Sequence, residues 1–165
     1  MARLSNVISY MRYKYPDKQS LSSDRLKLMV FLADWKSAIL CGKQMTNIRW
    51  EIKKGKLDPP KSNNEKEFAS PKPLSSIRYF LQKLFGLKKL SSEEKEIIDF
   101  VIESSWDKNW EEFVQLIYST YPIIAEQESA KLDLGSMASK YNELVRPLLN
   151  KVGIDAPSDT GLAQS

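Results

Sequence analysis

The chain has 165 residues, of which 42% are hydrophobic and 28% charged, and its formal net charge is +4. A chain of this length buries roughly 70% of its unfolded surface in one domain and needs no disulfides to fold. It contains one cysteine and no histidine. This composition excludes an internal disulfide, a Ser-His-Asp or Cys-His catalytic centre, and zinc sites built from imidazoles or clustered thiolates.

Charges of both signs are interspersed along the chain, which indicates a solvated surface of mixed charge. The mild excess of positive charge is compatible with an acidic partner or with nucleic acid. No apolar run approaches the ~20 residues needed to cross a bilayer. Residues 1–18 also lack the pattern of a secretory signal. We therefore expect a soluble, cytoplasmic protein for which a membrane is not a partner.

Apolar residues at helical spacing predict a first helix from Leu4 to Tyr15, which ends before Pro16. The stretch SSDRLKLMVFLADWKSAILCGKQM, residues 22–45, predicts a second helix. Ser22 can cap its start, and Gly42 suits the left-handed position after its end. Its apolar residues leave no clean polar face, which is typical of a helix surrounded by other helices.

The pattern changes to period two in MTNIRWEIKKGK, residues 45–56, where Ile48, Trp50 and Ile52 alternate with polar residues. Alternation of this kind predicts a half-buried strand, with a turn at Gly55. Residues 57–74 contain four prolines and few apolar residues. We expect them to form a loop or insertion.

Residues 75–86 predict a basic amphipathic helix, either an ordinary surface helix or one that touches an acidic partner or membrane. Two further helices begin with capping boxes, formed by Ser91 with Glu94 and by Asn109 with Glu112. Pro122 is expected to end the second of these. The residues predicted to face inward are Ile97, Ile98, Val101 and Ile102 in one helix, and Trp110, Phe113, Val114 and Ile117 in the other.

A last helix is predicted from Ser136 to Gly153, with Pro147 as a kink or an early end. Its predicted apolar face comprises Met137, Tyr141, Leu144, Val145, Leu148 and Leu149. Residues 154–165 are expected to form a flexible tail. Together these elements predict a mainly α, single globular domain spanning residues 1–153. Six to seven helices would surround Asp24–Cys41, with a small β element near residues 46–56.

The sequence offers few groups for catalysis. The pairs Glu93–Glu94 and Glu111–Glu112 lie in first helical turns, where acids favourably face the helix dipole. Asp34 interrupts an apolar run, which indicates either structural pairing or acid–base chemistry. Glycine-rich phosphate loops and metal-binding motifs are missing from the sequence. We expect no enzyme activity, no cofactor and no metal.

Two stretches, RYKYPDK and RWEIKKGK, mix aromatic residues with cations. Single-strand nucleic-acid binders combine these residue types, because bases stack on aromatic rings while cations pair with phosphates. The same mixture also occurs on ordinary protein surfaces. Nucleic-acid binding therefore remains an alternative to protein binding.

The order of the motifs DRLKLMVFLADW, CGKQMTNIRWEI, LSSEEKEIIDFVIE and WEEFVQLIYSTYPI resembles the Panacea, or SocA-like, antitoxin domain family. The likeness covers about residues 4 to 125. Asp34, Gly42, Thr46 and Trp50 match residues of the first motifs. The family's G-P-V turn is absent, since Lys56 and Leu57 follow Gly55, and its histidine is absent as well. The chain is therefore similar to a diverged member.

The resemblance implies a protein that neutralises a cognate toxin, encoded nearby, by direct stoichiometric binding. It also implies an association with phages or prophages, where an accessory protein with a nucleic-acid or other protein target is the alternative. The family's signature turn corresponds to residues 49–56, which offer Arg and Trp, the side chains favoured at interfaces. The residues we expect to contact the partner are Arg49, Trp50, Lys53, Lys54, Lys56 and Asp34.

Overall fold

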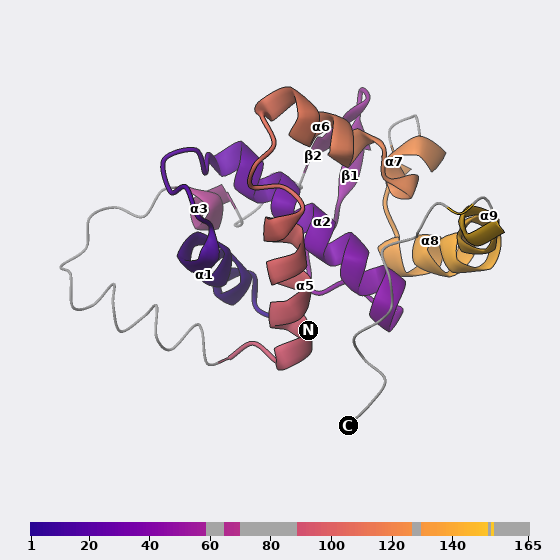
Figure 1. Ribbon diagram of the computed structural model, residues 1–165, viewed down its shortest axis with the longest axis horizontal. Helices are drawn as coiled ribbons and strands as arrows, with labels where there is room; N and C mark the ends of the chain where they lie inside the picture. Colours follow the sequence, from indigo (N-terminus) through magenta and orange to yellow (C-terminus); the bar gives the residue numbers. More distant parts are fainter. Residues whose placement is uncertain (59–64, 70–88, 127–129, 152, 154–165) are drawn as a thin grey trace.

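The computed structural model describes residues 1–58, 65–69, 89–126, 130–151 and 153 (Figure 1). The chain is mainly helical and carries a three-stranded sheet in the order β2-β1-β3, so the predicted fold class is confirmed. The predicted helix at 75–86 and the predicted tail at 154–165 lie outside the described residues. None of the helices in the described ranges is long and apolar enough to cross a membrane.

Helix α2 (Ser23–Cys41) is the centre of the fold, and Figure 1 shows it crossing the molecule among the other helices. Its ends are as predicted: the Ser22 side chain accepts a hydrogen bond from the backbone N–H of Arg25, and Gly42 is left-handed with φ 71°. Buried side chains surround its axis almost completely, as expected for a helix packed on several sides. They include Leu26, Met29, Val30, Phe31, Ala33, Trp35 and Ala38.

Helices α1 (Leu4–Lys14) and α5 (Ser92–Glu103) pack against α2 and against each other. The predicted capping box of Ser91 and Glu94 is present. The four predicted inward-facing residues of α5 are all buried. Between the two helices, the Tyr10 hydroxyl donates to Asp99 Oδ2 over 3.0 Å.

Helix α6 (Trp110–Tyr118) also starts with its predicted capping box, and Phe113 and Ile117 are buried. The prediction for Trp110 is wrong, because this residue is 48% exposed. Trp110 is the first residue of α6, and its ring lies beside that of Phe113, with ring centroids 6.2 Å apart. Pro122 does not end this helix either. It lies in the first turn of α7 (Tyr121–Ala125), where a missing N–H costs no helical hydrogen bond.

The predicted strand forms a hairpin of β1 (Glu51–Lys53) and β2 (Lys56–Asp58). Its two-residue turn places Lys54 and Gly55 at φ 51° and 70°. Two consecutive left-handed residues are typical of the type I′ turn, whose twist matches that of paired strands. Strand β3 (Ala130–Lys131) pairs with the other edge of β1. The strand is shorter than the alternating pattern suggested, but Ile48, Trp50 and Ile52 are all buried as predicted.

A last helix with a kink or an early end at Pro147 was predicted, and the structure shows three consecutive helical segments in its place. Helix α8 (Leu134–Lys140) continues into a π-helical turn, η1 (Tyr141–Val145), and then into α9 (Arg146–Lys151). Pro147 has no N–H for the carbonyl four residues earlier, so the α pattern fails at this place. The wider turn changes the helical phase, and Leu144 and Leu148 are 63% and 61% exposed instead of forming an apolar face.

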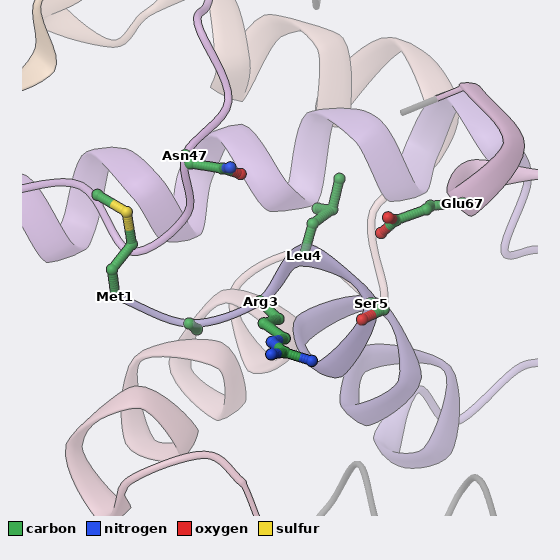
Figure 2. A pocket seen from close by; sticks show the side chains of 7 residues that line it. Met1, Arg3, Leu4, Ser5, Asn47 and Glu67 are labelled. Atoms are coloured by element: carbon green, nitrogen blue, oxygen red, sulfur yellow. The ribbon is translucent and has the colours of Figure 1, made fainter. Parts of the chain in front are cut away.

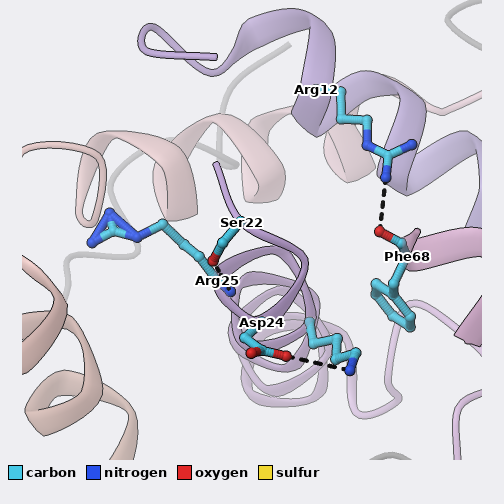
Figure 3. A network of polar contacts seen from close by, with 6 residues as sticks. Arg12, Ser22, Asp24, Arg25 and Phe68 are labelled. Carbon is cyan, nitrogen blue, oxygen red and sulfur yellow. Dashed lines mark hydrogen bonds and ion pairs between the residues drawn. The ribbon is translucent and has the colours of Figure 1, made fainter. Parts of the chain in front are cut away.

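The predicted loop at 57–74 is also partly structured. It begins inside β2 and contains the short helix α3 (Glu65–Phe68), whose Phe68 is only 1% exposed. The Arg12 guanidinium on α1 donates to the carbonyl oxygens of Phe68 and Ala69 over 2.9 and 2.8 Å. Figure 3 shows the contact between Arg12 and Phe68, with the capped start of α2 nearby. One buried aromatic ring and one arginine thus hold α3 on the core.

Candidate binding surface

Asp34 fixes the start of the sheet to the central helix. Its carboxylate is fully buried and accepts three hydrogen bonds from the segment that leads into β1. The Thr46 backbone N–H donates to Oδ1 over 2.6 Å, while the Thr46 hydroxyl and the Trp50 indole N–H donate to Oδ2 over 2.7 and 2.8 Å. A buried carboxylate is stable only when its oxygens are paired in this way. Asp34 therefore has a structural role in this geometry.

Burial is the largest influence on the acidity of Asp34, and it raises the pKa of this carboxyl from 3.8 to about 6. The hydrogen bonds from the Thr46 and Trp50 side chains and from the backbone of Thr46 and Met45 act in the opposite direction, because they favour the charged form. The carboxyl is enclosed by protein donors that are already in use. It therefore has no free geometry for proton transfer to a substrate.

Trp50 completes this anchor. Its indole is 1% exposed and meets the Phe31 ring edge to face, with centroids 5.3 Å apart and an interplanar angle of 78°. The predicted partner contacts of Asp34 and Trp50 are therefore wrong, because neither side chain reaches the surface. Both residues instead lie on the buried side of the sheet, where they fix the segment that leads into β1.

The outer face of the sheet is basic. Alternation along β1 and its register with β2 and β3 bring exposed cations together around the half-buried Glu51. Lys53 pairs with Lys56 in the register, and Lys131 pairs with Glu51. We call this surface the basic hairpin face; it consists of Arg49, Lys53, Lys54, Lys56 and Lys131.

Glu51 moderates but does not neutralise this charge. Its carboxylate lies 2.7 Å from the Lys53 ammonium, and this hydrogen bond lowers the pKa of Glu51. Asp58 is the register partner of Glu51 on β2. The pair of Glu51 and Lys53 is partly exposed, so its contribution to stability is small. The other four cations of the face do not take part in this ion pair.

Sequence reasoning found four of the five cations and missed Lys131. Lys131 follows Lys53 by more than seventy residues, and only the pairing of β3 with β1 brings it to the face. Strand β2 is also held by a distant element, since the Tyr118 hydroxyl on α6 accepts from the Leu57 N–H over 3.4 Å. Neither relationship leaves a local pattern in the sequence.

Among the described residues, no group of three or more Cys, Asp or Glu side chains is placed to hold a metal ion. A pocket of about 490 Å³ lies where the N-terminal segment meets Asn47 and α3. Figure 2 shows Asn47 and Glu67 on either side of Leu4, with Arg3 turned away from them. Burial raises the pKa of Glu67. Among the described residues, no hydrogen bond joins the side chains of Ser5, Asn47 and Glu67 in its lining.

A scan against protein-family models gives no match for this chain, and neither the curated proteins nor the solved structures include a match. The resemblance to the Panacea domain therefore stays a prediction from the sequence motifs.

Proposed function

We propose that this protein is a non-catalytic binding domain that holds an acidic protein partner on its basic hairpin face. The observation that carries the proposal is a concentration of five exposed cations: Lys53, Lys56 and Lys131 in the strands of one short, anchored sheet, Lys54 in its turn and Arg49 just before it. Opposite charge on a partner steers association and fixes its orientation. The motif resemblance gives the expected partner: a cognate toxin that is neutralised by direct stoichiometric binding.

The anchoring of the face supports this proposal. Trp50 and Ile52 are buried on the inner side of β1, while Asp34 holds the preceding segment through three hydrogen bonds. The type I′ turn fixes the tip of the hairpin. A surface that is already ordered loses little conformational freedom on binding, so more of the contact energy remains as affinity.

Nucleic acid is the second candidate, and the same cations favour it. Single-strand binders also need aromatic platforms on which bases stack. Trp50, the aromatic residue of this stretch, lies on the buried side of the strand. The basic hairpin face thus offers phosphate contacts without stacking, which favours an acidic protein over a single strand.

The test is co-expression of the chain with the product of the gene beside its own. We expect that product to be toxic alone, harmless with this chain, and recovered with it in a one-to-one complex. The variant Arg49→Gln/Lys54→Gln/Lys56→Gln should lose the complex and the protection. The matched control is Lys14→Gln/Lys89→Gln/Lys140→Gln, which removes three positive charges from other exposed positions and should retain both.

A salt titration separates the two candidates. Binding to nucleic acid should fall steeply between low and physiological salt, because each phosphate contact releases counterions. A complex with a folded acidic protein should weaken far less steeply over that range, because no condensed counterions are released from a phosphate backbone. A harmless neighbouring product, or a complex that both triple variants retain equally, would contradict the proposed function.

A further inference from the structure

Two tryptophans stand out on the surface at the corner between α5 and α6. Trp106 and Trp110 are 46% and 48% exposed, whereas Trp35 and Trp50 are 6% and 1% exposed. Large exposed indoles are costly to leave in water, and tryptophan is enriched among the residues that dominate protein interfaces. We call the segment 103–112, which contains both indoles, the tryptophan corner.

The backbone of the tryptophan corner is held by internal hydrogen bonds. The Trp106 N–H donates to the Ile102 carbonyl over 2.9 Å, and the buried Ser105 hydroxyl donates to Val101 O over 2.6 Å. The capping box of Asn109 and Glu112 fixes the start of α6. The two indoles are therefore presented from an ordered turn.

A buried arginine on the central helix adds to this order. Arg25 is 5% exposed, and its guanidinium donates to the carbonyl oxygens of Lys108 and Asn109 over 2.5 and 3.4 Å. It also lies over the Phe113 ring at 4.6 Å, and Phe113 in turn contacts Trp110. Among the described groups, its hydrogen-bond partners are these two carbonyls and the Tyr15 hydroxyl. These contacts of the Arg25 guanidinium hold the backbone of the tryptophan corner in place.

The charge of the tryptophan corner is opposite to that of the rest of the protein. Residues 103–112 contain four acids and one lysine, a net charge of −3 in a chain of +4. Glu103, Asp107 and Glu111 are exposed beside the indoles in sequence, while Glu112 is used in the capping box. Acidic surroundings repel phosphate groups, so nucleic acid and anionic membranes are unsuitable partners for this surface.

Elsewhere in the chain, a lysine covers an exposed aromatic ring. Phe100, on α5, is 40% exposed, and the Lys36 ammonium lies over its ring at 4.4 Å. In the described part of the chain, no cation lies over Trp106 or Trp110. Tryptophan is the strongest of the aromatic residues in attracting a cation to its face.

From these observations we infer that the tryptophan corner is a second binding surface, and that its occupant is a lysine- and arginine-rich segment of a partner protein. The cations of that segment stack on the two indoles and pair with Glu103, Asp107 and Glu111. The inference does not depend on the basic hairpin face, which has the opposite charge and selects acidic partners.

The experiment measures binding of a fluorescent oligoarginine peptide to the full chain by anisotropy, with an oligoglutamate peptide as the probe of opposite charge. We expect saturable, salt-sensitive binding of oligoarginine. Oligoglutamate should bind through the basic hairpin face alone, so that its binding is lost in the triple hairpin variant and unchanged by the tryptophan substitutions. Trp106→Ser/Trp110→Ser should weaken oligoarginine binding by about tenfold or more, since two cation–π contacts are lost. Asp107→Asn/Glu111→Gln should weaken it as well.

Matched controls keep the result specific. Leu144→Ser/Leu148→Ser removes two other exposed apolar side chains, and Glu96→Gln/Glu126→Gln removes two other exposed acids. Both controls should bind oligoarginine like the unaltered chain, and so should the triple hairpin variant. The inference is overturned if the unaltered chain does not bind oligoarginine, or if the tryptophan and control variants bind it equally. Circular dichroism verifies that each variant is folded.

Discussion

The indole N–H of Trp50 donates to the buried Asp34 carboxylate over 2.8 Å, and this contact joins the sheet to the central helix. The bond explains why an acid occurs within the apolar run of the central helix. Its partners Trp50 and Thr46 lie sixteen and twelve residues further along the chain. Together these bonds hold the segment that leads to the basic hairpin face.

Asp34→Asn should destabilise the fold without changing its shape. An asparagine offers one carbonyl oxygen to three donors, and its NH2 group then faces a donor of Thr46 or Trp50. We expect the free energy of unfolding at neutral pH to fall by roughly 1–3 kcal/mol, the cost of an unpaired buried donor. Urea denaturation measures it. Glu103→Gln, at an exposed position, is the control and should stay within about 0.5 kcal/mol. Equal stability of the two variants would contradict the role of Asp34.

The stability of the protein should depend on pH through Asp34. Its pKa is about 6 in the folded chain and 3.8 when unperturbed, so the folded state binds the proton more tightly than the unfolded state. The proton-linked part of its contribution to stability is therefore fully present below about pH 4 and is lost as the pH rises through about 6, while the hydrogen bonds that Asp34 accepts remain. The stability of the unaltered chain minus that of Asp34→Asn should fall across this window and be constant above it. Urea titrations at successive pH values measure the difference, and parallel curves would refute it.

Local signals in the sequence were enough to predict much of the helical framework. Ser22, Ser91 and Asn109 cap helices as predicted, because capping depends on residues three positions apart. The apolar run of α2 likewise predicts a helix packed on all sides. These features need no knowledge of the rest of the fold.

The features that the sequence did not reveal depend on distant residues. Phe68 is buried where α3 contacts α1 and α2, and Arg12, more than fifty residues earlier, binds the end of α3. Lys131 joins the basic hairpin face only through pairing of β3 with β1. Trp110 shows the opposite error: its spacing fits the apolar face of α6, but this first-turn residue is 48% exposed. The spacing of apolar residues along a helix does not show which of its turns are covered by neighbouring elements.

Arg25→Met should be strongly destabilising although methionine fills a similar volume. The substitution leaves the Tyr15 hydroxyl and the Lys108 carbonyl without their buried donor and removes the contact with the Phe113 ring. We expect a loss of about 2–4 kcal/mol in the free energy of unfolding. The comparison is Arg12→Met, which removes a more exposed arginine of α1 that binds the end of α3. This variant should lose less stability. Thermal and urea unfolding give the two values, and the reverse order would show that Arg25 is not a buried clamp.

Two of the helix caps offer a prediction with an adjacent control. Ser91→Ala removes the hydroxyl that accepts from the Glu94 N–H, and should cost about 1 kcal/mol of stability. Ser92→Ala, one position later and exposed, removes an equal hydroxyl that caps nothing and should be nearly neutral. Asn109→Ala should cost about as much as Ser91→Ala. Because the caps belong to different helices, the double variant should show nearly the sum, as chemical denaturation can verify.

The turn of the hairpin predicts opposite effects at neighbouring residues. Lys54 adopts φ 51°, a left-handed conformation that asparagine tolerates better than lysine, so Lys54→Asn should stabilise the protein by about 0.5 kcal/mol. Gly55 is at φ 70° with open space around its Cα, so Gly55→Ala is disfavoured by backbone conformation alone, by about 1–2 kcal/mol. Urea denaturation of the two variants gives the signs. If both substitutions destabilise equally, the turn is not of type I′, and the hairpin face is held by Asp34 and the core rather than by its tip.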